Sequence, residues 1–163
     1  LTEAIIKGRS KNTEKEKIIE KFQEYYNKLI NNEKWLLNKR LLKALSKRYN
    51  LAILTGRPRK EAYYVLRKNN VRTYFLTIVA MEDISKHKPN PEGILKLMKN
   101  YNNKVAYYFG DTIDDMKAAV SANIIPVGVL PPQDKSSKLQ KLLIINGAKY
   151  VMNDINKIME VLQ

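Results

Sequence analysis

From Asn50 to the C-terminus, short apolar runs alternate with amphipathic stretches, and this alternation limits the possible folds more than any other feature. The apolar runs are nearly continuous, as is typical of strands covered on both faces. Strand-helix alternation with short connections predicts an α/β fold, with a Rossmann-like parallel sheet, flanking helices and right-handed crossovers. The predicted strands are 51–54, 75–80, 105–109, 124–129 and 150–151. The predicted helices of this part are 58–69, 91–100, 112–122, 136–145 and 154–162.

The N-terminal part of the chain differs, because residues 1–36 contain no strand candidate. Residues 15–30 carry apolar side chains at helical spacing, and residues 36–48 form a second amphipathic helix candidate that leads into the first strand. We interpret residues 1–32 as the remnant of a helical cap and residues 33–163 as the α/β core. The apolar positions of the first helix are Ile18, Ile19, Phe22, Tyr25, Tyr26 and Leu29.

Composition excludes several classes of protein. The chain has 163 residues, of which 44% are hydrophobic, and this fits one globular domain with room for a small appendage. No apolar run is long enough to span a bilayer, and the first residues lack the layout of a signal peptide. Because there is no cysteine, disulfides, zinc–thiolate sites and cysteine nucleophiles are excluded. We therefore expect a cytoplasmic protein that does not enter a membrane.

The formal net charge of +14 raises the question of nucleic-acid binding. A solvated lysine-rich surface is the favoured interpretation, because the lysines are spread along the chain and alternate with glutamate in 13–28. No zinc site, recognition helix or aromatic RNA-binding motif supports the other interpretation. A positive field would still attract phosphorylated metabolites.

Three polar clusters follow predicted strands, at the sheet edge where α/β proteins bind ligands. Thr55-Gly56-Arg57 follows the strand 51–54. A hydroxyl and backbone amides at the start of a helix form an anion site. An ordinary helix N-cap by Thr55 explains the same residues, and for this cluster taken alone it is the favoured explanation.

The second cluster is the segment from Lys86 to Glu92, which contains Lys88 directly before a proline. Proline favours an extended backbone at Lys88, so this lysine could be held against a phosphate and a neighbouring carboxylate. A surface turn with solvated lysines is the alternative. His87, the only histidine, is interpreted as a loop residue.

The third cluster places Asp111, Asp114 and Asp115 directly after the strand 105–109 and Gly110. Acidic residues favour a helix N-terminus, which is the simpler explanation. Three carboxylates within five residues repel each other unless a cation joins them, and this favours a Mg²⁺ site.

In order and spacing, these clusters resemble the motifs of the haloacid dehalogenase superfamily, and its phosphoglycolate-phosphatase-like subfamily in particular. The resemblance covers the chain from about Leu37 to the C-terminus. Leu51 to Gly56 is similar to the second motif, Lys88-Pro89-Asn90-Pro91-Glu92 to the third, and Phe109 to Asp115 to the fourth. Each motif is weak alone, but the three at successive strand ends are a specific combination.

The resemblance implies a phosphohydrolase site and a role for each residue. Asp111 would bind Mg²⁺ directly, and Asp115 would be a second metal ligand or act through water. Thr55 would bind a phosphoryl oxygen, with the backbone amides of Gly56 and Arg57 nearby. Lys88 would offset negative charge as the phosphoryl group moves. Lys88 and Thr55 are thus the implied catalytic residues.

The superfamily's first motif, Asp-x-Asp, which carries the nucleophile, does not occur in the chain. We expect it upstream of Leu1, on a strand that lies between the strands ending at Thr55 and Gly110. Without that strand, two central strands have unpaired edges, so this chain alone is expected to be inactive and to associate, for example as a homodimer.

Several functions remain open at this point. The leading one is a Mg²⁺-dependent phosphatase acting on a small phosphorylated metabolite through an aspartyl-phosphate. A phosphomutase shares the same site, and a dehalogenase fits the acidic fourth motif less well. The alternative from another class is a non-catalytic binding or scaffold domain that lacks the nucleophile.

Overall fold

The structure is a computed structural model that describes residues 12–99, 101 and 105–162. The chain divides into two compact units between Trp35 and Leu36. The N-terminal unit contains helix α2 (Asn12–Asn32), which is longer than the predicted helix 15–30. The assignment of this unit to a cap stays a prediction. In the described residues, no helix is both long and apolar enough to cross a membrane.

The C-terminal unit is a mixed α/β fold, as the sequence predicts. Its strands are β1 (Ala52–Leu54), β2 (Thr77–Val79), β3 (Tyr107–Gly110), β4 (Ile125–Val129) and β5 (Tyr150–Met152). Its α-helices are α3 (Lys39–Arg48), α4 (Arg59–Lys68), α5 (Glu92–Met98), α6 (Ile113–Ser121) and α7 (Ser137–Ile145). The described part of this unit also contains the 3₁₀ segments η1 (Arg72–Tyr74), η2 (Met81–Asp83) and η3 (Ile155–Glu160).

All strand pairs are parallel, which confirms the predicted sheet type, but the strands form two sheets. β1 pairs with β2, and β3, β4 and β5 follow one another in a second sheet. Within the described part of the chain, β1 and β3 are therefore each hydrogen-bonded to a neighbouring strand along one edge only. The carboxyl ends of these two strands carry the first and third polar clusters.

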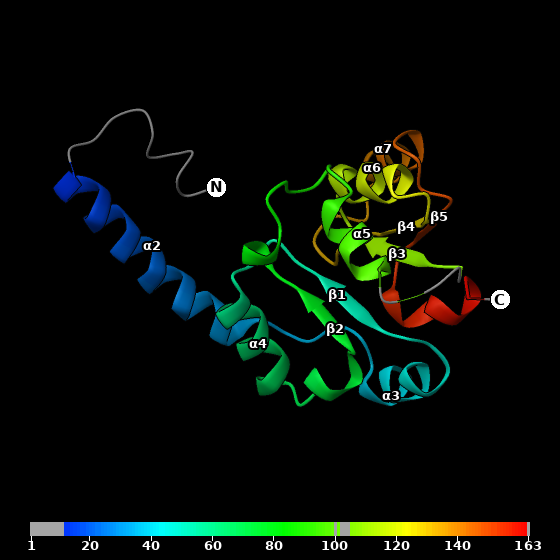
Figure 1. The fold of residues 1–163 in the computed structure, drawn as a ribbon, viewed down its shortest axis with the longest axis horizontal. Helices are drawn as coiled ribbons and strands as arrows, with labels where there is room; N and C mark the ends of the chain where they lie inside the picture. The colour runs from blue at the N-terminus through cyan, green and yellow to red at the C-terminus, as the bar shows by residue number, and fades with distance from the viewer. Residues whose placement is uncertain (1–11, 100, 102–104, 163) are drawn as a thin grey trace. The chain divides into compact units, whose positions relative to one another are not determined.

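The helices pack on the strands through small and aliphatic side chains. α6 contacts β3 and β4, and α7 contacts β4 and β5, as Figure 1 shows. Ala118 and Ala119 of α6 are fully buried and pack with Ile94 of α5. A second cluster joins α6 and α7 to the end of β4 through Met116, Leu130, Leu143 and Ala148.

One predicted element has a different form. The segment predicted as a helix over 154–162 is the 3₁₀ segment η3, which is shorter. The Asp154 side chain accepts a hydrogen bond from the backbone N–H of Asn156, which starts the segment with a tight turn.

Candidate active site

The turn between β3 and α6 is closed by the carboxylate of Asp115, which is 3% exposed. Its Oδ2 atom accepts hydrogen bonds from the backbone N–H of Asp111 at 3.2 Å, and from the backbone N–H and hydroxyl of Thr112 at 3.1 and 2.7 Å. In return, the Thr112 hydroxyl oxygen accepts the backbone N–H of Asp115, which completes a capping box at the start of α6. The acidic turn is therefore held in one conformation.

Gly110 permits this close approach. A Cβ atom at this position would lie 2.5 Å from Cγ and 2.7 Å from Oδ2 of Asp115. Any larger residue would therefore displace the Asp115 carboxylate. Glycine is therefore required at position 110 because a side chain would clash with Asp115, and its backbone conformation is not the reason.

Lys88 reaches the same carboxylate from the loop that precedes α5. Its Nζ atom lies 2.6 Å from Oδ1 of Asp115 and 3.4 Å from the hydroxyl of Tyr108. The Tyr108 hydroxyl in turn donates to Oδ1 of Asp115 at 3.1 Å. Lys88 and Asp115, two of the predicted site residues, are thus brought together by the fold.

Charge and burial act in opposite directions at Asp115. Burial raises the pKa of its carboxyl, but the hydrogen bond and the charge of Lys88, with the Thr112 hydrogen bonds, hold the pKa below its ordinary value. Burial raises the pKa of Tyr108 far above its ordinary value, and the negative charge of Asp115 adds to this effect. The pair therefore consists of a carboxylate and a phenol that stays protonated.

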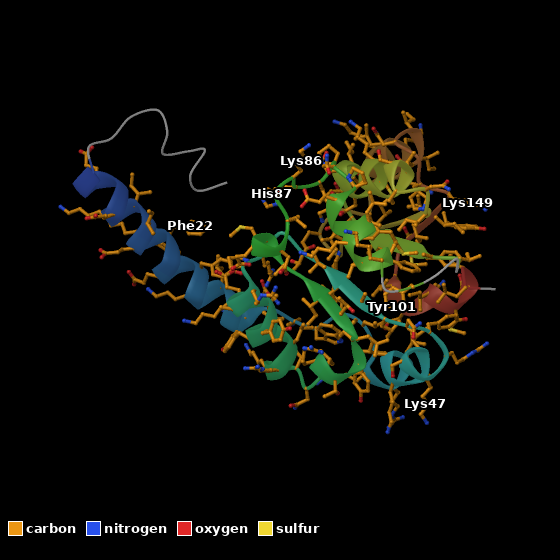
Figure 2. The ribbon with its side chains drawn as sticks, viewed as in Figure 1. Phe22, Lys47, Lys86, His87, Tyr101 and Lys149 are labelled. Atoms are coloured by element: carbon orange, nitrogen blue, oxygen red, sulfur yellow. The ribbon has the colours of Figure 1, made fainter. Side chains whose placement is uncertain are left out.

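The loop that carries Lys88 is held by Glu92, the last residue of the Lys-Pro-x-Pro-Glu sequence. The Glu92 carboxylate accepts the backbone N–H groups of Ser85 at 2.9 Å and Lys86 at 2.8 Å. Hydrogen bonds from these two backbone groups lower the pKa of Glu92. Figure 2 shows Lys86 and His87 on this loop, and both side chains are exposed, in agreement with a loop role for His87.

The first polar cluster lies at the end of β1 and is fixed from the neighbouring turn η2. The hydroxyl oxygen of Thr55 accepts the backbone N–H of Arg57 at 3.1 Å, and no acceptor for the hydroxyl hydrogen is found among the described residues. The Glu82 carboxylate accepts the backbone N–H of Arg59 at 2.9 and 3.1 Å, and Asp83 forms an ion pair with the Arg59 side chain. The backbone amides of Arg57 and Arg59 are therefore already hydrogen-bonded, whereas a Cβ atom at Gly56 would meet no atom within 4 Å.

The structure does not join all the predicted site residues directly. Asp111 is exposed at the tip of the acidic turn, and no hydrogen bond links Thr55 to Lys88 or Asp111 within the described ranges. The described residues also contain no group of three or more His, Cys, Asp or Glu side chains placed to hold a metal ion. The assignment of a metal to Asp111 and Asp115 stays a prediction.

A largely apolar cavity of about 530 Å³ lies between the two sheets. Ala52 and Leu54 of β1 line it on one side, and Tyr108 and Phe109 of β3 on the other. Ile94 of α5 and Ile158 of η3 also contribute to its walls. The cavity thus lies between β1 and β3, each of which is hydrogen-bonded to a neighbouring strand along its other edge.

Sequence reasoning missed Tyr108, Thr112 and Glu82. The Thr-x-x-Asp spacing of Thr112 and Asp115 is a capping-box pattern that was available in the sequence. Tyr108 is two residues before Gly110 and so lies on the same face of β3, which places its ring under α6. No sequence pattern indicates that Glu82 accepts the backbone N–H of Arg59, because this contact depends on the placement of η2 beside the start of α4.

Residues 2–129, more than half of the chain, match the family model of the haloacid dehalogenase-like hydrolases. The imidazoleglycerol-phosphate dehydratase of Phytophthora nicotianae is 35% identical over 105 residues, which are 62% of this chain and 23% of that protein. A protein of Caldanaerobacter subterraneus, "Putative pyrophosphatase PpaX", is 29% identical over 112 residues, or 68% of this chain and 49% of that protein. The chain spans less than half the length of either curated relative.

Among solved structures, a predicted phosphoglycolate phosphatase from Haemophilus somnus has a TM-score of 0.77 to this chain. The alignment covers 98% of this chain and 72% of that one, at 21% sequence identity. At this identity the likeness shows the fold.

Proposed function

Because this chain belongs to the haloacid dehalogenase-like hydrolase family, we propose that it acts as a Mg²⁺-dependent phosphatase on a small phosphorylated metabolite. The observation that carries the proposal is the 2.6 Å ion pair between Lys88 and Asp115, next to the exposed carboxylate of Asp111. This places a fixed cation and a free carboxylate at the carboxyl end of β3. The formal net charge of +14 would favour the approach of an anionic substrate.

In the proposed reaction, each group of the chain has one role. Lys88 offsets the negative charge of the phosphoryl oxygens during transfer, which is the main catalytic device in such reactions. The Thr55 hydroxyl donates its free hydrogen to a phosphoryl oxygen, and the Gly56 amide can do the same from its open position. Asp115 holds Lys88 and the acidic turn in place.

The donor set fits Mg²⁺ through Asp111. The two oxygens of Asp115 already accept five hydrogen bonds, from Lys88, Tyr108, Thr112 and the Asp111 amide. Direct metal binding by Asp115 would break some of these bonds, so we assign it an indirect role. Asp111 would be a direct ligand, which suits a cation that binds few carboxylates and keeps several waters. When bound, Mg²⁺ would neutralise charge on the phosphoryl group.

The nucleophile is proposed to come from a segment outside these 163 residues, since no Asp-x-Asp occurs in them. We place that segment as a parallel strand between β1 and β3. Two features support this placement: the edges of β1 and β3 that lack a strand partner in the described part of the chain, and the apolar cavity between them. A strand there would end beside Lys88, where an aspartate could attack phosphorus while the ester oxygen leaves with a proton as the alcohol, and water would then hydrolyse the aspartyl-phosphate to orthophosphate. An unfilled edge would instead favour association between chains.

The test is a hydrolysis assay of the full-length protein on a panel of phosphorylated metabolites and an aryl phosphate, with and without Mg²⁺. We expect release of orthophosphate only when Mg²⁺ is present. Transfer of phosphate within a sugar phosphate, without net release, would favour a phosphomutase instead. Absence of both reactions across the panel would contradict the proposal.

A further inference from the structure

Tyr108 belongs to strand β3, and its phenol hydroxyl contacts both charged groups of the site, Lys88 and Asp115. Successive side chains of a strand point to opposite faces, so Tyr108 lies on the face of β3 that packs against α5 and α6. Its ring contacts the cluster of Ile94, Ala118 and Ala119. The small alanine side chains let α6 pack closely against β3. The Tyr108 ring extends from this apolar cluster, so that its hydroxyl reaches the Asp115 carboxylate.

The Tyr108 hydroxyl completes a triangle of polar atoms. It donates to Oδ1 of Asp115 at 3.1 Å and accepts a longer hydrogen bond from Nζ of Lys88 at 3.4 Å. Lys88 itself donates to the same Oδ1 atom at 2.6 Å. A protonated lysine has three N–H donors, and the described residues provide acceptors for two of them, which leaves one.

Tyr108 is half-buried, and a hydroxyl that is partly withdrawn from water has a cost unless it is hydrogen-bonded; here its bonds go to the two charged groups of the site. Phenylalanine would fill the same core volume without that cost. The hydroxyl is therefore best explained by what it does to Lys88 and Asp115. With a hydrogen bond to Asp115 alone, the lysine ammonium could rotate about Oδ1. Hydrogen bonds to both Asp115 and Tyr108 fix the direction of its third N–H.

We propose that Tyr108 is a positioning residue, which holds Lys88 so that its remaining N–H points at the phosphoryl group of the substrate. This inference rests on the proposed function, because it assumes that a phosphoryl group binds beside Lys88. Tyr108 acts through Lys88 and Asp115, without touching the substrate. Its effect should therefore appear in the affinity for phosphate and depend on the presence of Lys88.

Tyr107 is a matched control on the same strand. It lies on the opposite face of β3, where its ring stacks on Phe109 with centroids 6.5 Å apart. No hydrogen bond of the Tyr107 hydroxyl is found among the residues that the structure describes. Tyr107→Phe therefore removes the same atom as Tyr108→Phe, without any contact to Lys88.

The experiment measures binding of orthophosphate to the full-length protein by isothermal titration calorimetry in the presence of Mg²⁺. The proteins are the wild type, Tyr108→Phe, Tyr107→Phe, Lys88→Met and the double variant of Tyr108→Phe with Lys88→Met. We expect Tyr108→Phe to weaken binding about tenfold, as for one hydrogen bond to a charged group, and Tyr107→Phe to leave it unchanged. In the Lys88→Met background, Tyr108→Phe should have no further effect.

Melting temperatures are measured on the same proteins, and Lys88→Gln, which keeps a donor for Asp115, replaces Lys88→Met if the latter does not melt cooperatively. An equal loss of affinity from Tyr108→Phe in both backgrounds, or no loss at all, would overturn the inference. A lowered melting temperature with unchanged phosphate affinity would show a purely structural role and would also overturn it.

The two proposals can fail separately. Hydrolysis of phosphate esters that is equal in the wild type and Tyr108→Phe would remove the positioning role and leave the phosphatase. Orthophosphate binding that depends on Tyr108 and Lys88, without any phosphoryl-transfer activity, would support the positioning role and remove the phosphatase. A wild type that binds no orthophosphate would contradict the positioning role, and the hydrolysis assay would then decide the phosphatase proposal by itself.

Discussion

Nζ of Lys88 lies 2.6 Å from Oδ1 of Asp115, and this ion pair ties the loop before α5 to the first turn of α6. The two residues are 27 positions apart in the sequence. Their side chains are 24% and 4% exposed, so the pair lies mostly outside bulk water. Breaking such a pair on one side leaves a charge that water cannot solvate well.

Replacement of Lys88 by methionine is therefore expected to destabilise the full-length protein by about 3 kcal/mol, because Asp115 would remain as an uncompensated buried charge. Urea unfolding at neutral pH gives the measurement. Lys86→Met is the control, since Lys86 is on the same loop and its side chain is exposed. A loss of stability that is the same in both variants would show that the ion pair has no special role.

Gly110→Ala is expected to destabilise the protein by about 2 kcal/mol through overpacking against Asp115. The Asp115 carboxylate cannot move aside at low cost, because it accepts five hydrogen bonds. Gly56→Ala is the comparison for stability alone, since a Cβ at that position meets no atom within 4 Å. Equal unfolding midpoints for the two variants would contradict the steric argument.

The sequence predicted the strand ends and the meeting of Lys88 with the acidic turn, because parallel strands bring their carboxyl ends to a shared edge. The resemblance implied a direct metal contact for Asp111, but it left open whether Asp115 is a second ligand or acts through water. Asp111 and Asp115 look alike in a sequence, but the turn geometry exposes the first and buries the second among donors. That difference depends on the absence of a side chain at Gly110, which leaves room for the Asp115 carboxylate, and on the packing of α6.

Residues that act through tertiary contacts were also outside the reach of pattern reasoning. Tyr108 lies in an apolar run whose composition predicts a buried strand and nothing more. Glu82 reaches the start of α4 only because η2 and α4 lie at neighbouring strand ends. The separation of the strands into two sheets agrees with the unpaired edges that the missing Asp-x-Asp strand predicts for β1 and β3, whereas local periodicity alone does not report which strands pair.

Glu92 is expected to make stability depend on acid pH. Backbone hydrogen bonds from Ser85 and Lys86 lower its pKa in the folded state below the ordinary value for glutamate. A depressed pKa stabilises the fold above the unfolded-state pKa, and this contribution is lost as pH falls through the folded-state pKa. The unfolding midpoint in urea should therefore fall as the pH is lowered below the ordinary pKa of glutamate, about 4.3, and it should fall less in Glu92→Gln.

Glu61→Gln is the matched control for this measurement. Glu61 and Glu92 are each an acidic residue in the first turn of a helix, α4 and α5 respectively. Both should interact with the helix dipole, so the difference between the variants isolates the loop hydrogen bonds of Glu92. If Glu61→Gln reduced the acid sensitivity as much as Glu92→Gln, the loop contacts would not be its cause.

Asp111→Asn is expected to abolish Mg²⁺-dependent hydrolysis of an aryl phosphate by the full-length protein, and to weaken Mg²⁺ binding measured by calorimetry. Asp111 is the exposed carboxylate of the acidic turn, and removal of its charge should leave the hydrogen bonds of Asp115 and the stability intact. Asp114→Asn is the control, because Asp114 is an exposed acid of the same turn to which the proposal gives no metal contact. Equal loss of Mg²⁺ affinity in both variants would mean that general negative charge, and no specific ligand, attracts the cation. Unchanged turnover in Asp111→Asn would remove the metal assignment, while the Lys88–Asp115 pair would still be explained as a structural tie.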